Sequence, residues 1–97
     1  MVEPGGEMAR RLRIHSQSFD DMTATFELVE GSDAPEFTVE ITFTETVGLS
    51  PYVVFRDEER IGTGLVLVTR PERHQFRGAL DVILGRLDPP ARLARKR

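Results

Sequence analysis

Two segments of the chain alternate between apolar and polar residues, which is the pattern of a half-buried β-strand. In 22–28 and 37–44 the apolar members fall on one face, namely Met22, Ala24, Phe26 and Leu28, then Phe37, Val39, Ile41 and Phe43. Both segments are also rich in β-branched and aromatic residues, which suit a pleated, half-buried surface. The pattern therefore predicts two strands that each turn one face to a core.

Two further stretches indicate strands. Residues 8–15 alternate around Leu12 and Ile14, and residues 52–68 form an apolar–turn–apolar sequence typical of a hairpin, with Asp57–Glu59 at its tip. Gly62 and Gly64 within the second arm indicate a bulge or a close backbone approach. The polar or turn-rich segments 16–21, 30–35 and 47–51 are predicted to be loops.

The apolar period changes after residue 70. Apolar residues then recur at helical spacing on one face: Phe76, Leu80, Ile83, Leu84 and Leu87. The spacing of Thr69 and Glu72 suits a capping box, and Pro89 and Pro90 stop the helix. A helix over 71–87 follows. Residues 1–7 are expected to be disordered, 8–88 to form a single domain and 89–97 a basic tail.

Composition narrows the class of protein. A chain of 97 residues holds one domain at most. It contains no cysteine, which excludes disulfides, thiolate catalysis and cysteine-based metal sites. No apolar run approaches the roughly 20 residues that a membrane span needs. We therefore expect a cytoplasmic protein with no membrane partner.

Charge is distributed unevenly along the chain. Residues 20–60 hold eleven acidic and two basic residues, a net charge of −9, whereas residues 61–97 hold eight basic and three acidic residues, a net charge of +5. Such asymmetry indicates either a partner surface or two halves that neutralise each other in the fold. If nucleic acid is bound, the candidate residues are Arg10, Arg11, Arg13, Arg70, Arg73, Arg77, Arg92 and Arg95, with Lys96 and Arg97 beside them.

Catalytic and cofactor chemistry find little support in the sequence. His15, Ser16 and Asp20 could form a hydrolytic set, but a chain with 16 acidic residues offers such combinations by chance. His74 and Asp81 stand seven residues apart, too far to share a metal on one helix. No phosphate-binding loop is present, since Gly62–Gly64 lacks the third glycine and the following helix of a dinucleotide site. We expect no enzyme, no bound nucleotide and no cofactor.

Three segments together resemble a known family. Asp21–Gly31 is similar to the strand-and-turn pattern Asp-Val-Thr-Gly-Thr-Ile-Glu-Leu-Pro-Glu-Gly, Phe37–Ile41 to the strand that follows it, and Tyr52–Val68 to a closing hairpin that ends in Gly-x-Gly-Val-Val. This order, over roughly residues 10–68, resembles the C-terminal β-barrel domain of elongation factor Tu-like translational GTPases. The resemblance implies a six-stranded barrel without a GTP site, which in the family meets partner proteins and the aminoacyl-tRNA backbone.

The chain departs from the family in ways that bear on binding. The barrel's opening strand has no counterpart, which leaves two open sheet edges. Either the helix covers that gap or two chains pair their edges as a dimer. The hairpin tip carries Asp57, Glu58 and Glu59, which repel phosphates, and Phe43 stands where the family has a lysine. Both changes argue against inherited tRNA binding.

The predicted fold is mainly β: a small antiparallel β-barrel or sandwich of about five strands with one C-terminal helix. The predicted function is a non-catalytic interaction module, homodimeric or bound to a protein partner. The alternative is an RNA- or ribosome-associated accessory protein that uses the arginines. The helix face either packs on the strands or binds a partner; in the second case the contact residues are Phe76, Leu80, Ile83, Leu84 and Leu87.

Overall fold

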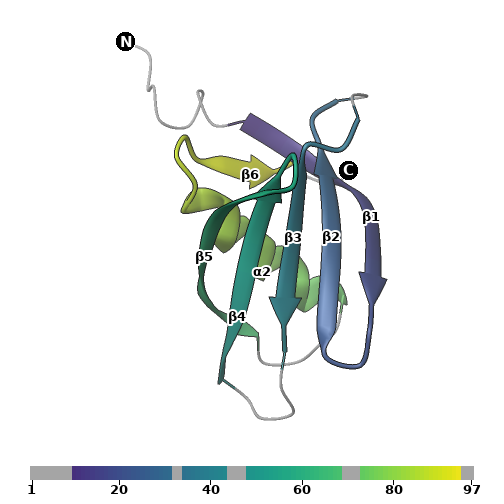
Figure 1. Ribbon diagram of the computed structural model, residues 1–97, viewed down its shortest axis with the longest axis vertical. Coiled ribbons are helices and arrows are strands. Elements are labelled where there is room, and N and C mark those ends of the chain that lie inside the picture. Colours follow the sequence, from purple (N-terminus) through teal and green to yellow (C-terminus); the bar gives the residue numbers. More distant parts are fainter. Residues whose placement is uncertain (1–9, 32–33, 44–47, 69–72, 95–97) are drawn as a thin grey trace.

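Six strands form one curled sheet, and a helix lies against its concave face (Figure 1). The computed structural model describes residues 10–31, 34–43, 48–68 and 73–94, the side chains of residues 73–75 excepted. In chain order the elements are β1 (Arg10–Phe19), β2 (Thr23–Val29), β3 (Phe37–Thr42), β4 (Gly48–Arg56), β5 (Glu59–Val68), α2 (Arg73–Gly85) and β6 (Ala91–Leu93). The strand order β5-β4-β3-β2-β1-β6 makes β5 and β6 the two edges of a half-barrel.

Alternation sets the two faces of the sheet. Residues paired across neighbouring strands share a face, so one inward row runs through Ala24, Ile41, Tyr52 and Gly64. The next row, which points outward, runs through Ser18, Thr25, Glu40, Val53 and Thr63. The inward members of β2, β3 and β4 are buried, as the alternation in the sequence predicts.

Both predicted consequences of the paired glycines are confirmed. Val54 pairs with Gly62 and Phe55 with Arg60, so Ile61 is the extra residue of a β-bulge. The close backbone approach falls at Gly64, which lies against the ring of Tyr52. The hairpin itself closes through Asp57 and Glu58, both with positive φ (53° and 67°), as a two-residue turn between paired residues Arg56 and Glu59.

Two strands extend into segments predicted as loops. β1 continues through Ser16 to Phe19 because β2 pairs with it along that length, with His15 as the bulge residue. β4 begins at Gly48, so most of the predicted turn over 47–51 belongs to the sheet. Pro51 is tolerated there because the pairing between β3 and β4 ends at Tyr52, so that no described residue of β3 pairs with it and needs its missing N–H.

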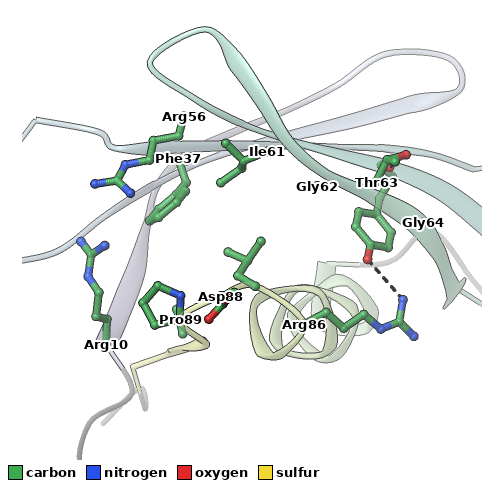
Figure 2. A pocket seen from close by; sticks show the side chains of 13 residues that line it. Arg10, Phe37, Arg56, Ile61, Gly62, Thr63, Gly64, Arg86, Asp88 and Pro89 are labelled. Carbon is green, nitrogen blue, oxygen red and sulfur yellow. Dashed lines mark hydrogen bonds between the residues drawn. The ribbon is translucent and has the colours of Figure 1, made fainter.

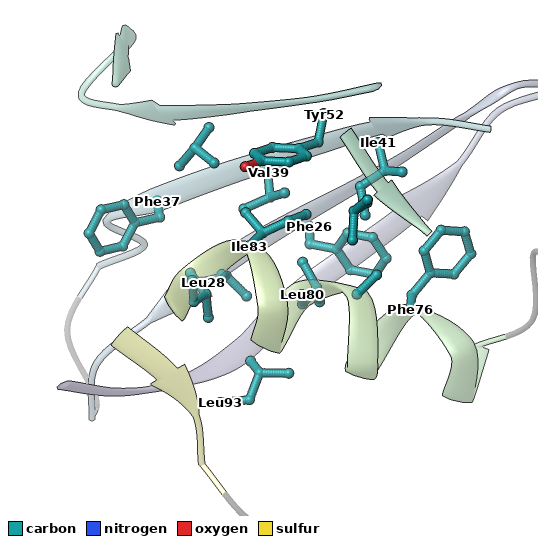
Figure 3. Packing of buried hydrophobic residues seen from close by; sticks show 14 of the residues in the cluster. Phe26, Leu28, Phe37, Val39, Ile41, Tyr52, Phe76, Leu80, Ile83 and Leu93 are labelled. Atoms are coloured by element: carbon teal, nitrogen blue, oxygen red, sulfur yellow. The ribbon is translucent and has the colours of Figure 1, made fainter. Parts of the chain in front are cut away.

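Helix α2 turns its apolar face to the sheet. Phe76, Leu80, Ile83 and Leu84 are fully buried there, packed with the inward side chains of β2, β3 and β4 (Figure 3). The helix ends at Gly85, before the predicted residue 87. The amides of Arg86 and Leu87 instead bond the carbonyls of Ile83 and Leu84, three residues back, which tightens the last turn.

Part of the predicted basic tail is a strand. Ala91–Leu93 forms β6, which pairs in parallel with Arg10–Leu12 of β1 and buries Ala91 and Leu93. Two helix side chains hold it: Arg77 donates to the Ala94 carbonyl (2.9 Å), and Asp81 accepts from the Leu93 amide (2.9 Å). The description of 89–97 as a tail is therefore wrong for residues 91–93. Three residues are too few for their alternation to stand out in the sequence.

The predicted fold class is confirmed: the described residues form a mainly β, barrel-like sheet with one helix after its fifth strand. The sheet has six strands, since β6 adds one to the expected five, and the parallel β1–β6 pair makes it mixed. The helix fills the inside of the half-barrel, and its C-terminal end and the turn after it lie beside β5.

Candidate functional site

Among the residues that the structure describes, the arginines proposed for nucleic acid lie in different environments. Arg11 and Arg92 are exposed and directly paired across the β1–β6 ladder, so these two lie side by side. Arg13 is also exposed and donates to the Gly31 carbonyl (2.9 Å). Arg77 donates to the Ala94 carbonyl at the end of β6. Arg70 and Arg95 lie outside the described residues, as does the side chain of Arg73.

Arg10 belongs to an ion-pair network of its own. Its guanidinium bonds both Glu30 (2.8 Å) and Glu36, and Glu36 also pairs with Arg56 (3.1 Å). The two guanidinium groups lie over the ring of Phe37, at 5.5 and 5.6 Å from its centroid. Such cation–π contacts fix both arginines beside a buried aromatic ring. Arg10 is therefore neutralised within the fold and unavailable as a phosphate contact.

The Glu36 carboxylate makes this network sensitive to acid. Its hydrogen bond to Arg10 lowers the pKa of Glu36, and the charge of Arg56 adds to the effect. A carboxylate with a lowered folded-state pKa stabilises the fold above its unfolded pKa, and that stability is lost as the pH falls through the folded value. We expect the free energy of unfolding to decline below about pH 4, the ordinary glutamate range. Glu36→Gln should flatten the decline in urea titrations repeated across pH, and an unchanged profile would contradict this role.

A cavity opens between β5 and the turn that follows α2 (Figure 2). Its volume is about 690 Å³, within the range of small-molecule sites. Arg10, Phe37 and Arg56 stand at one end, and Arg86 stands at the other. Tyr52 also lines the cavity and is hydrogen-bonded to Arg86. The wall between them is formed by Ile61, Gly62, Thr63, Gly64, Leu87, Asp88, Pro89 and Ala91. The cavity thus has arginine side chains at both ends and a largely aliphatic middle.

Arg86 closes one end of the cavity. Its Nη1 donates to the Leu65 carbonyl (2.6 Å) and, more weakly, to the Tyr52 hydroxyl (3.3 Å), and its guanidinium lies 5.8 Å from the Tyr52 ring centroid. Within the described residues it forms no ion pair with an acidic side chain. Its charge therefore has no carboxylate partner there, unlike the charges of Arg10 and Arg56. This role of Arg86 could not be predicted from the sequence, because neither Leu65 nor Tyr52 is near it along the chain.

The helix side chains predicted as a partner-binding face are not available to a partner. Phe76, Leu80, Ile83 and Leu84 have no exposed surface, and Leu87 is partly buried against the core and lines the cavity. Of the two alternatives for the helix, packing on the strands is the one observed. The partner-binding prediction for the four buried residues is wrong in this structure because the curled sheet already covers them.

An exposed apolar surface lies on the other side of the sheet. Leu49, Leu65 and Leu67 are 59%, 49% and 58% exposed, and Leu49 pairs with Leu67 while Pro51 pairs with Leu65. We define the apolar patch as the outward residues Leu49, Pro51, Val53, Phe55, Leu65 and Leu67. The outward positions of β2 up to Glu27 and those of β3, in contrast, are threonine or glutamate: Thr23, Thr25, Glu27, Thr38, Glu40 and Thr42. The outer face is therefore apolar on β4–β5 and polar on β2–β3.

The residues considered for catalysis do not form a recognisable set. His15 is exposed at the β1 bulge, and the Ser16 hydroxyl donates to Glu27 (2.7 Å). Asp20 starts the turn into β2, where its amide bonds the Thr23 carbonyl. Asp81 accepts a hydrogen bond from the Leu93 amide of β6, and the side chain of His74 lies outside the described residues.

No group of three histidine, cysteine or acidic residues is arranged to hold a metal among the residues that the structure describes. Within the same ranges, no helix has the length and apolarity to cross a membrane. Comparisons with protein-family models, curated proteins and solved structures found no match to this chain. The resemblance to the elongation factor Tu C-terminal barrel therefore stays a prediction.

Proposed function

We propose that this protein is a non-catalytic interaction module that pairs with a second copy of itself through the apolar patch. The observation that carries the proposal is the exposure of three leucines on adjacent strands, on a face whose other half is polar. Contiguous apolar surface of this kind on a small domain marks an interaction site. The resemblance to a barrel that lacks a GTP site supports a binding role without nucleotide hydrolysis.

A second copy fits the patch for two reasons. In a two-fold symmetric dimer both copies use the same surface, so an uncharged apolar patch on one copy meets the same apolar patch on the other. Glu40 borders the patch beside Val53, and Arg60 borders it beside Phe55. A rotation about the two-fold axis can bring these unlike charges of two copies together at the rim, where charge complementarity sets the register.

The outer face suits this contact better than the free edge of β5. Residues 61–68 contain no charge and no proline to discourage edge pairing. However, Arg86 already bonds the Leu65 carbonyl, which points away from β4, and Leu87 lies next to Gly62. The turn after α2 therefore occupies the middle of that edge. Packing of two outer faces needs no rearrangement of these residues.

Substitution of one patch leucine tests the proposal. Leu67→Arg places a charge within the patch without touching the core, because Leu67 is 58% exposed. Burying an unpaired charge in an interface is strongly unfavourable, so the variant should be monomeric. We expect light scattering after size exclusion to give twice the 11.0 kDa chain mass for the wild type, and 11.0 kDa for the variant.

Ser18→Arg is the matched control. It adds the same charge to the same outer face, but on β1, where the residue is already exposed and polar. This variant should keep the mass of the wild type. A wild type that stays monomeric as its concentration rises, or a dimer that Leu67→Arg leaves intact, would contradict the proposal.

A second candidate function is an RNA- or ribosome-associated accessory role. The pair formed by Arg11 and Arg92, both exposed, favours it. Phosphate contacts of arginine release counterions, so binding would weaken steeply with salt. If RNA shifts the measured mass at low salt, the shift disappears at high salt, and Arg11→Ala with Arg92→Ala abolishes it, this candidate replaces the first.

A further inference from the structure

The cavity beside β5 has features of a ligand site that the proposed dimer does not use. Leu49, Leu65 and Leu67 point away from it on the outer face, and none of them lines it. Ile61, in contrast, is an apolar side chain that is 42% exposed and faces the cavity from the bulge (Figure 2). The bulge turns this side chain out of the regular alternation and into the cavity wall.

The lining chemistry selects an aliphatic ligand over an aromatic one. The guanidinium groups of Arg10 and Arg56 both lie close to the ring of Phe37 (Figure 2). The Tyr52 ring is packed against Gly64 and has the guanidinium of Arg86 over it. Both aromatic rings are therefore engaged by the protein itself. The apolar surface left to a ligand is the aliphatic surface of Ile61, Leu87 and Pro89.

The charges at the two ends select the position of an anionic group. At one end Arg10 and Arg56 are compensated by Glu30 and Glu36. At the other end, Arg86 has no carboxylate partner among the described residues, and Asp88 on the adjoining turn is the one acidic side chain that lines the cavity. Arg86 presents a planar, permanently charged donor group that matches a carboxylate.

We propose that this cavity binds an unbranched aliphatic monocarboxylate, with its carboxylate on Arg86 and its hydrocarbon chain against Ile61, Leu87 and Pro89. The volume suits a medium-length chain, and the aliphatic side chains offer it apolar contacts. Asp88 opposes the carboxylate, so Asp88→Asn should tighten binding.

Decanoate, kept below its micelle concentration, is the probe, with isothermal titration calorimetry as the measurement. We expect saturable binding of one decanoate per chain, and no detectable binding of acetate, which lacks the chain, or of decyltrimethylammonium, which reverses the charge. Arg86→Gln should weaken decanoate about tenfold or more, as expected for the loss of a charge-assisted contact, with Arg86→Lys in between. Ile61→Glu, at an exposed position, should abolish binding.

Leu67→Arg separates this proposal from the dimer. Residue 67 lies on the same strand as Ile61 but outside the cavity. The variant should therefore bind decanoate with the affinity of the wild type, whether or not the substitution changes the solution mass. Circular dichroism confirms that each variant is folded before titration. The proposal is overturned if the wild type does not bind decanoate saturably, if acetate binds equally well, or if Ile61→Glu and Arg86→Gln both bind unchanged.

Discussion

Replacement of Phe76 by alanine should destabilise the protein by about 3–5 kcal/mol, the cost typical of removing a fully buried aromatic side chain. Phe76 has no exposed surface and is the centre of an aromatic cluster. Its ring centroid lies 5.7 Å from that of Phe19, 5.5 Å from that of Phe26 and 5.9 Å from that of Phe43. The truncation leaves a cavity where four rings meet and detaches the start of α2 from the sheet.

Val82→Ala on the same helix is the control for this experiment. Val82 is 47% exposed on the outer side of α2, and alanine has the higher helix propensity. We expect its free energy of unfolding in urea to lie within about 0.5 kcal/mol of the wild type. Equal losses for the two variants would mean that α2 does not pack on the sheet through Phe76.

Gly64→Ala should cost about 1–3 kcal/mol, as the insertion of an extra methyl group against a buried side chain does. An added Cβ at this position would lie 2.9 Å from Oη of Tyr52 and 3.1 Å from its Cε2 and Cζ atoms. Tyr52 is only 4% exposed and has Arg86 over its ring. A rigid ring in that position cannot rotate out of the way, so the strands must separate or the ring must leave the core.

Gly62→Ala is the matched control, two residues away on the same strand. Its Cβ would meet Leu87 at 3.5 Å and Val54 at 3.9 Å, which are ordinary contacts. Since alanine restricts the unfolded chain more than glycine does, this variant should be neutral or up to about 1 kcal/mol more stable. Thermal unfolding of the two variants side by side measures the difference, and a stable Gly64→Ala protein would show that Tyr52 does not occupy this position.

The strands were predictable where alternation is long and regular. In Phe37–Thr42 and Thr23–Val29 the residues predicted to face the core are buried, because each strand packs one side against the core. The glycines of β5 also carried a usable signal, since a strand interior accepts glycine mainly at bulges and close approaches. The helix register followed from the spacing of Phe76, Leu80, Ile83 and Leu84.

Long-range pairing accounts for what the sequence could not reveal. β6 exists because β1 offers an edge and because Arg77 and Asp81 hold its backbone, none of which is local to residues 91–93. The cavity depends in the same way on contacts between Arg86 and β4–β5. The arginines could be identified in the sequence as candidate phosphate contacts. Only the fold shows that Arg10 is paired with glutamates, whereas Arg11 and Arg92 are exposed and lie side by side.

The apolar outer face of β4–β5 could not be predicted from the pattern of apolar residues. Leu49 and Pro51 fall in a segment predicted as a turn, so their place on a strand beside Leu65 and Leu67 was hidden. A run such as Leu65–Val68 gives no sign of which residues point inward. Pairing with β4 decides it: Val66 and Val68 are buried, and the two leucines are exposed.

The most direct test of the proposed interface is a dilution series followed by methyl NMR of the wild-type protein. If two copies meet through the apolar patch, the methyl signals of Leu49, Leu65 and Leu67 should shift together with concentration. Those of the buried Leu12 and Ile83 should stay in place. Methyl positions that do not change with concentration, or changes confined to residues beside Arg11 and Arg92, would contradict the account.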